Sequence, residues 1–167
     1  MDKEENRDIN KAYFAGGCFW GMEHLMQQHP GVSSVVSGYM GGKKEHPTYR
    51  EVCSGMTGHL EAIAVTYNAH QVNFESLAKL FFEIHDPTQS DGQGPDIGSQ
   101  YASAIFYQND EEKQIAEKLI NMLEAKGYNI VTKLLPMWPF WQAEDYHQDY
   151  YQKNRKRPYC HRYEKKF

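Results

Sequence analysis

Hydrophobic residues recur along the chain with two spacings that alternate from one segment to the next. In the segment 61–67 every second side chain falls on the same face, which is the period of a β-strand. In the segment 74–84 the apolar side chains recur every three or four residues, as on one face of a helix, and Asn73 is placed to cap it. The same criteria predict strands over 11–15, 32–39, 61–67, 101–107 and 128–135, and helices over 18–28, 74–84, 110–126 and 143–152.

This alternation of strands and helices predicts an α+β fold. We expect a two-layer sandwich in which a central mixed or antiparallel sheet is covered by helices, with a ferredoxin-like βαβ core. The chain of 167 residues is long enough for one hydrophobic core and leaves little room for a second. We therefore expect an N-terminal extension over 1–10, a single domain over 11–152 and an irregular C-terminal tail over 153–167.

The charge of the chain argues against some classes of protein. The formal net charge is -4 and the sequence pI is about 6.0, whereas a nucleic-acid-binding domain would show a basic surface. The N-terminal residues lack the apolar core of a signal peptide, and no stretch of the sequence is apolar over the length of a membrane span. We therefore expect a cytoplasmic protein that binds neither nucleic acid nor membranes.

The most informative residue is Cys18, which stands in the sequence GGCFWG between a predicted strand and a predicted helix. Unpaired backbone N–H groups and the helix dipole favour a thiolate at a helix N-terminus, so we expect a lowered thiol pKa and a reactive sulfur nucleophile. The two glycines let the backbone turn sharply, and the two aromatic rings offer apolar walls for whatever the sulfur attacks. The alternative, a small buried hydrophobic residue, is weakened by this setting.

The other two cysteines are Cys53 and Cys160. Three cysteines do not form the framework of paired disulfides typical of a small secreted domain, and no Cys-x-x-Cys spacing indicates a zinc site. Cys53 follows the apolar Val52, so we expect it on a buried strand with a structural role. Cys160 is far from Cys18 in the sequence, and only the fold could bring the two thiols together.

A carboxyl group and three further polar side chains are candidates for the same site. Glu61 begins a predicted strand with an apolar face, and partial desolvation there would raise its pKa and suit it to general acid catalysis. A solvated glutamate at the end of a strand is an equally open alternative. Tyr49 and Tyr101 are each either a core aromatic residue or a hydrogen-bond donor in a site. Asp96, in the sequence GPDIG, is by local sequence an ordinary turn residue.

Six motifs, taken together, resemble the A-type peptide methionine sulfoxide reductases. They are GCFWG at 17–21 followed by Glu23, GYMGG at 38–42, VCSGMTGHLEA at 52–62, HDPT at 85–88, DIGSQY at 96–101 and YHQDY at 146–150. These motifs occur in the order of the family and span most of the chain. The ordered set is much more specific than GCFWG alone.

The resemblance implies a reductase that acts on methionine S-sulfoxide, free or in oxidised proteins, and restores methionine. Carried over by position, Cys18 is the nucleophile that attacks the sulfoxide sulfur and becomes a sulfenic acid. Glu61 donates a proton to the sulfoxide oxygen, which is a poor leaving group until it is protonated. The hydroxyls of Tyr49 and Tyr101 hydrogen-bond the same oxygen as charge develops.

The resemblance also implies a substrate pocket and a recycling step. Phe19 and Trp20 line the apolar pocket for the S-methyl group, and Asp96 binds the polar end of the substrate. Cys160 attacks the sulfenic acid to form a disulfide with Cys18, which thioredoxin then reduces. No metal or organic cofactor takes part in this cycle.

Some positions depart from the family pattern. Leu60 stands where many relatives have alanine, the loop 90–95 lacks a frequent arginine, and Ala102 replaces another. The lost positive charge bears on substrate preference rather than on the type of reaction. The paired-cysteine, glycine-rich tail of some relatives is also absent, so we expect a two-cysteine cycle. We expect a monomer, although the basic residues 165–166 would also suit the start of a linker to a B-type reductase domain.

Two other classes of function are weaker alternatives. A cysteine hydrolase would activate its thiolate with a histidine and form an acyl-enzyme, whereas we expect the histidines to be packing or surface groups, among them His85, His147 and His161. A peptide-binding module without catalysis would use the aromatic loop 138–141, with Trp138, Phe140 and Trp141, for which core filling is the favoured role. Such a module would not depend on Cys18 and would consume no reductant.

Overall fold

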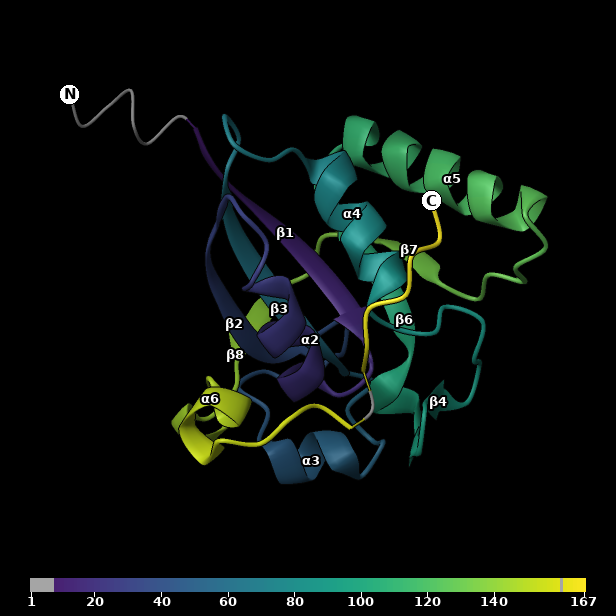
Figure 1. Cartoon of the computed structure of the whole chain (residues 1–167). Helices are drawn as coiled ribbons and strands as arrows, with labels where there is room; N and C mark the ends of the chain where they lie inside the picture. Colours follow the sequence, from purple (N-terminus) through teal and green to yellow (C-terminus); the bar gives the residue numbers. More distant parts are fainter. Residues whose placement is uncertain (1–7, 160) are drawn as a thin grey trace.

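A six-stranded mixed sheet is the centre of the computed structural model, which describes residues 8–159 and 161–167 (Figure 1). Only the β6–β7 pair is parallel in this sheet, and all other neighbours are antiparallel. In sheet order the strands are β7 (Lys133–Pro136), β6 (Ser103–Tyr107), β1 (Ile9–Gly16), β3 (Leu60–Asn68), β2 (Val32–Met40) and β8 (Phe140–Gln142). The prediction of an α+β fold with a mixed sheet is therefore confirmed.

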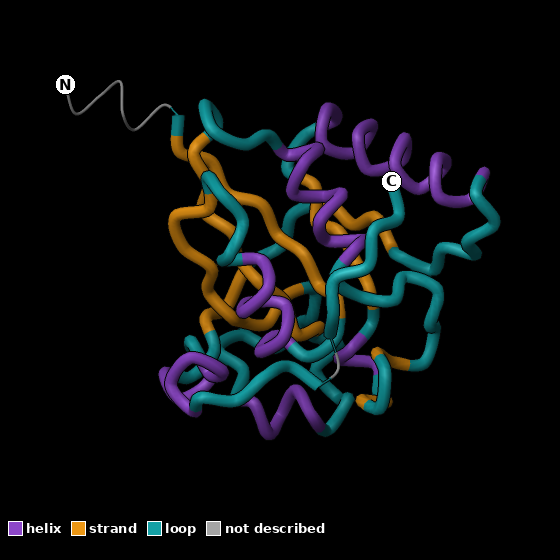
Figure 2. Tube along the Cα trace, in the orientation of Figure 1, coloured by secondary structure: helices purple, strands orange, loops and turns teal. Residues whose placement is uncertain are grey.

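Three longer helices pack on the sheet or on one another. The helix α2 (Phe19–Met26) lies against β2 and β3, α4 (Phe74–Glu83) lies against β1, and α5 (Asp110–Ala125) packs on α4 (Figure 2). Shorter elements are α3 (Tyr49–Cys53), α6 (Tyr150–Asn154), the 3-10 helices η1 (Ser99–Tyr101) and η2 (Asp145–His147), and the small sheet of β4 (Gly92–Gln93) with β5 (Asp96–Ile97). No helix in the described part of the chain is long and apolar enough to cross a membrane.

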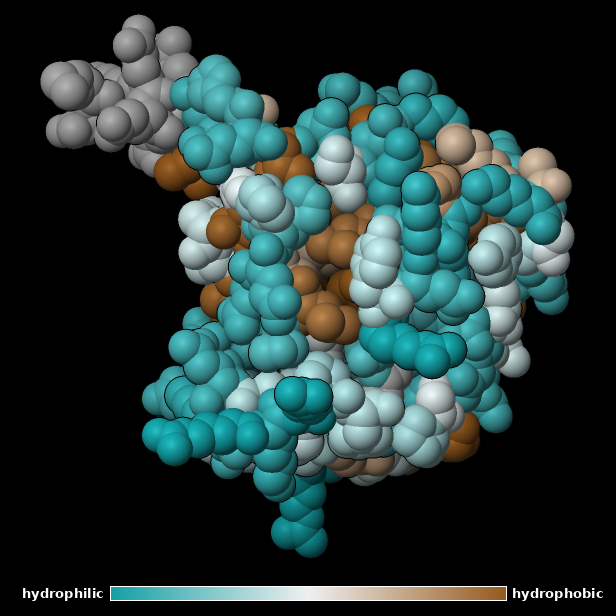
Figure 3. All heavy atoms as spheres, in the orientation of Figure 1, coloured by the Kyte–Doolittle hydropathy of each residue, from teal (hydrophilic) through white to brown (hydrophobic). Residues whose placement is uncertain are grey.

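The surface is mainly hydrophilic on the face that Figure 3 displays, but an apolar hollow opens near its centre. A cavity of about 280 Å³ lies there between α2 and α4, and Leu25, Leu80, Ile84 and Tyr163 contribute to its lining. Tyr163 belongs to the C-terminal tail, which therefore runs beside this hollow.

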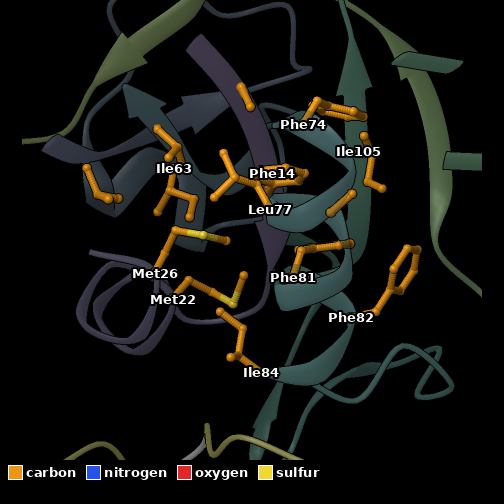
Figure 4. Packing of buried hydrophobic residues seen from close by; sticks show 14 of the residues in the cluster. Phe14, Met22, Met26, Ile63, Phe74, Leu77, Phe81, Phe82, Ile84 and Ile105 are labelled. Carbon is orange, nitrogen blue, oxygen red and sulfur yellow. The ribbon is translucent and has the colours of Figure 1, made fainter. Parts of the chain in front are cut away.

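The main hydrophobic core lies between the helices and one face of the sheet (Figure 4). Phe14 of β1 is fully buried, and its ring stacks on Phe81 at 5.1 Å and on Phe74 at 5.9 Å between ring centroids. Met22 and Met26 bring the apolar face of α2 to the same core. Burial of each such side chain stabilises the folded state by about 1.5–3 kcal/mol relative to an exposed position. This packing fixes α2 against β1 and β3.

The opposite face of the sheet carries a smaller cluster of buried residues. Four alanines occur there, and larger side chains such as Phe106 and Met40 fill the remaining space. Phe140 of β8 packs against this cluster and approaches Gly38 so closely that a Cβ at Gly38 would lie 2.3 Å from the ring. Gly38 is thus required for β8 to pair with β2.

Two segments predicted as regular elements differ in the structure. The strand predicted over 128–135 is present only as β7, because the Tyr128 N–H donates to Leu123 at the end of α5 and the Val131 N–H donates to Pro87. The strand predicted over 101–107 begins only at Ser103, since Tyr101 ends the 3-10 helix η1.

Three local predictions in the site-forming segments were wrong. Cys53 does not lie on a buried strand: it ends α3 and is exposed. The aromatic loop 138–141 is partly the strand β8, which pairs with the edge of β2. The helix predicted over 143–152 is split into η2 and α6, because Asp149 adopts a left-handed backbone with φ 52°.

We expect the substitution Phe81→Ala to lower the free energy of unfolding by about 3–5 kcal/mol, because it leaves a cavity beside Phe14 in the closed core. Denaturant unfolding would measure this loss. The control Met56→Ala, at a side chain that is 88% exposed, should change the free energy of unfolding by no more than about 0.5 kcal/mol. Equal effects of the two substitutions would contradict the assignment of the core.

Candidate functional site

Cys18 lies at the junction between β1 and α2, where it is the N-cap residue of the helix. The turn is made by Gly17, whose φ of 91° favours glycine, and a Cβ there would lie 2.4 Å from Gln93. The Cys18 residue is only 6% exposed. The prediction that this thiol stands at the start of a helix is confirmed.

Glu61 is brought to the same place by the pairing of β1 with β3. These strands are antiparallel, with Phe14 opposite Ile63, so the end of β1 lies beside the start of β3. The Glu61 side chain is buried, and its Oε1 accepts a hydrogen bond of 3.2 Å from the backbone N–H of Phe19. Its Oε2 is buried and has no hydrogen-bond partner among the described residues. One carboxyl oxygen is therefore held by the helix N-terminus, while the other accepts no hydrogen bond from the part of the chain that the structure describes.

The pKa of the Glu61 carboxyl is raised well above its usual value. Burial is the largest cause, and negative charge on Cys18 raises the pKa further. The hydrogen bond from Phe19 acts in the opposite direction but does not outweigh burial. Glu61 can therefore keep its proton at a pH where an exposed glutamate would be ionised.

Two tyrosine hydroxyls lie close enough to Glu61 for its charge to affect them. Tyr49 begins α3 and Tyr101 ends η1, and both are partly buried. Burial raises the pKa of each hydroxyl, and the charge of Glu61 is the second cause in both cases. Both groups therefore remain protonated and can donate hydrogen bonds near Glu61. The exposed Cys53 lies close by, because the Tyr49 hydroxyl is its hydrogen-bond partner.

Aromatic rings form one wall of the site. Phe19 is buried, with its ring centroid 5.7 Å from Tyr39 and 5.1 Å from His147. Trp20 stacks on Tyr150 at 3.6 Å with an interplanar angle of 6°. The rings of the two residues that follow Cys18 are therefore held in place by other aromatic rings.

His147 is a component of this wall that the sequence did not single out for a role in the site. Its Nδ1 accepts a hydrogen bond of 3.0 Å from the Trp20 indole N–H, so Nε2 carries the proton of the neutral ring. That Nε2 is buried and has no partner among the described residues, and burial lowers the pKa of the imidazole. The YHQDY motif was the available signal, because it places a histidine three residues before Tyr150, the tyrosine that stacks on Trp20.

The remaining predicted residues lie around the site or outside the description. Asp96 is half-buried on β5, and its Oδ1 accepts a hydrogen bond of 3.2 Å from the Tyr159 hydroxyl. The charge of Asp96 raises the pKa of Glu61 and of Tyr101, so it belongs to the same cluster. Cys160 lies outside the described residues. No group of three His, Cys, Asp or Glu side chains within 8–159 and 161–167 is arranged to hold a metal ion.

A buried carboxylate, Glu23, fixes the segment that carries His147 and Tyr150. Its Oε2 accepts a hydrogen bond from the Ser37 hydroxyl at 3.0 Å, and its Oε1 accepts one from the Asp149 N–H at 2.6 Å. Burial raises the pKa of Glu23 to about 7. The Glu23 bond to Asp149 stabilises the left-handed break between η2 and α6 that was described above.

Comparison with known families gives an independent result. The model of the family described as "Peptide methionine sulfoxide reductase" matches residues 10–167. Peptide methionine sulfoxide reductase MsrA of Nautilia profundicola is 45% identical over 150 residues, which cover 90% of this chain and 87% of the relative. The protein of the same name from Sulfolobus acidocaldarius is 47% identical over 150 residues, with 89% and 85% covered.

A solved structure shares the arrangement of the elements. Mxr1 of Saccharomyces cerevisiae in its reduced form superposes with a TM-score of 0.86 and 33% sequence identity. The superposition covers 94% of this chain and 93% of Mxr1. Sequence and fold therefore point to the same family.

We expect the pKa of Glu23 to make stability depend on pH. Because the folded-state pKa is about 7 and the ordinary value is 4.5, the folded chain keeps a proton that the unfolded chain loses between these values. The free energy of unfolding should therefore fall as pH rises through this window. Glu23→Gln cannot titrate, so the free energy of unfolding of the parent minus that of the variant should decrease from pH 4.5 to 7.

Denaturant unfolding at several pH values would measure this difference. The control Glu124→Gln changes an exposed glutamate on α5 and should leave the pH dependence unchanged. A parent-minus-variant difference that stays flat across the window would contradict the role of Glu23.

Proposed function

The chain belongs to the peptide methionine sulfoxide reductase family and reduces methionine sulfoxide to methionine, and we propose that Cys18 and Glu61 carry out this reaction. The observation that carries the proposal is the position of the Glu61 carboxyl. It is buried, its pKa is raised, and it is hydrogen-bonded to the residue next to Cys18. A thiol and a protonated acid are therefore held together at one helix N-terminus.

In the first step both groups act on the substrate. The Cys18 thiolate attacks the sulfoxide sulfur, and Glu61 gives its proton to the sulfoxide oxygen through the unpartnered Oε2. The protonated hydroxyls of Tyr49 and Tyr101 donate hydrogen bonds to the same oxygen. The S–O bond of the substrate then breaks as the oxygen passes to the Cys18 sulfur, and the new bond between the two sulfur atoms breaks with its electron pair on the methionine sulfur. Cys18 is thereby oxidised by two electrons to a sulfenic acid, and methionine is released as the thioether.

The aromatic wall selects the substrate. Phe19 and Trp20 form an apolar slot for the S-methyl group, and the donors around Glu61 give hydrogen bonds to the sulfoxide oxygen on another side. An arrangement that separates the methyl arm from the oxygen arm favours one epimer, which we take to be the S-sulfoxide. Asp96 orients the polar end of the substrate, which is methionine sulfoxide either free or in an oxidised protein.

Cys160 resolves the sulfenic acid. Its thiolate attacks the Cys18 sulfur, an S–S bond forms, the S–O bond breaks, and the oxygen leaves as water. Thioredoxin then reduces the disulfide by thiol exchange. Mxr1 has been solved in complex with Trx2, which is consistent with this choice of reductant. The cycle uses no metal or organic cofactor.

The finer organisation of the chain follows the same proposal. The segment from β1 to β6 forms a ferredoxin-like βαβ core in a two-layer sandwich, and the antiparallel strand order β6-β1-β3-β2 supports this. Residues 11–152, together with Ile9 and Asn10 of β1, are the catalytic domain, and 153–167 are the tail with the recycling cysteine. The protein works as a cytoplasmic monomer.

We expect Glu61→Gln to lower kcat for the S-sulfoxide by roughly 10²- to 10⁴-fold, because an amide cannot supply the proton. Steady-state production of methionine with dithiothreitol would measure this loss. In the parent, kcat should fall as pH rises through the raised pKa of Glu61, and this fall should be absent from the variant. Glu124→Gln serves as the exposed control. Full activity of Glu61→Gln would refute the proposed acid.

We expect Cys160→Ser to form one methionine per enzyme at the parental rate but to lose thioredoxin-dependent turnover, because the sulfenic acid has no resolving thiol. Mass spectrometry after one turnover without reductant should find a Cys18–Cys160 disulfide in the parent and none in this variant. Cys53→Ser is the matched control, since Cys53 is a second thiol near Tyr49. A disulfide between Cys18 and Cys53 in the parent would overturn the recycling role of Cys160.

A further inference from the structure

The C-terminal tail follows a defined path across the molecule. After α6 it runs between α2 and α3 and then turns along α4 toward the C-terminus (Figure 1). Residues 161–167 are fastened to α4 by hydrogen bonds from the backbone N–H groups of Glu164 and Lys166 to Glu83, at 2.7 and 3.0 Å. Before position 160, the Tyr159 hydroxyl bonds to Asp96. The chain is therefore held on both sides of that position.

His161 is the tail residue that reaches the Cys18 turn. Its side chain is buried, and its Nε2 lies 2.7 Å from the carbonyl oxygen of Gly16. A carbonyl oxygen can only accept, so Nε2 donates this hydrogen bond. Gly16 is two residues before Cys18, so the bond fastens the tail to the turn that carries the thiol.

The notch that holds the His161 ring is completed by Gly21. A Cβ at Gly21 would lie 2.3 Å from Nδ1 of the ring and 2.8 Å from its Cγ, distances that a real side chain cannot adopt. Gly21 stands in the first turn of α2, where glycine costs about 0.5–1 kcal/mol relative to alanine. The absence of a side chain there is what lets the imidazole lie against the helix.

We propose that His161 is a positioning residue for the recycling step: its imidazole, bonded to the Gly16 carbonyl and seated against Gly21, keeps position 160 within reach of Cys18. This inference rests on the proposed role of Cys160. Adjacent Cα atoms are about 3.8 Å apart, and a disulfide needs its Cα atoms within roughly 4.4–6.8 Å. Because His161 is anchored next to Cys160, the Cys160 thiol can sample only positions around the Cys18 turn.

The proposed effect is on one step only. Formation of the sulfenic acid needs Cys18, Glu61 and the substrate, whereas the bond from His161 to the Gly16 carbonyl holds the tail. Formation of the S–S bond, with release of the sulfenic oxygen as water, needs the tail in place. Loss of the anchor should therefore slow resolution and spare the reduction of the sulfoxide.

The test compares two substitutions of His161 in the full chain. His161→Leu keeps an apolar side chain in the notch but removes the donor, whereas His161→Gln keeps a donor. In a single turnover with methionine S-sulfoxide and no reductant, His161→Leu should form methionine within about twofold of the parental rate and form the disulfide at least about tenfold more slowly. A sulfenic-acid trap such as dimedone should label Cys18 in this variant, and His161→Gln should recover much of the rate.

The control is Arg162→Ala, which changes the exposed neighbour of His161 and should leave both rates unchanged. An unchanged disulfide rate in His161→Leu would overturn the positioning role, and so would an equal slowing of methionine formation. If Cys160→Ser still forms the disulfide, the recycling proposal itself fails, whatever His161 does. If thermal unfolding shows that His161→Leu does not fold, Gly21→Ala gives the same comparison, because its methyl group displaces the ring.

Discussion

The hydrogen bond between the Phe19 backbone and Glu61 joins the two halves of the site, and it depends on the pairing of β1 with β3. A carboxyl group at a helix N-terminus would ordinarily be stabilised as an anion. Here burial dominates, and the pKa of Glu61 is raised instead of lowered. The same closed environment that makes the acid useful also requires the core beneath α2 to be well packed, since water that entered would weaken the largest cause of the raised pKa.

The aromatic wall shows how a short helix can be made rigid. The helix α2 has only 8 residues, too few to be stable by itself. The stacking of Trp20 on Tyr150 and its bond to His147 tie α2 to the segment from η2 to the start of α6. That segment is in turn held by Glu23, which also belongs to α2. Helix and wall therefore stabilise each other, and the thiol at the start of α2 gains a fixed position.

The hydrophobic pattern of the sequence predicted the elements whose periodicity is long and regular. It did not predict the local conformations that depend on contacts with distant parts of the chain. β3 and α4 were predicted nearly to their ends, and Glu61 was placed correctly at the start of its strand. The short α3 was missed, although the pattern Thr48-x-x-Glu51 is a capping box, and both of its hydrogen bonds are present. The break at Asp149 could not be predicted, because it depends on a hydrogen bond to Glu23, 126 residues earlier in the chain.

The long sequence separation between the parts of the site has a consequence for biosynthesis. Cys18 leaves the ribosome early. The partner of Trp20, His147, follows 127 residues later, and the partner of Gly16, His161, follows 145 residues later. Contacts of this range form slowly, and they cannot form before the last part of the chain has been made. During translation the Cys18 thiol therefore remains without the final neighbours that bury it until the C-terminal part of the chain has been made.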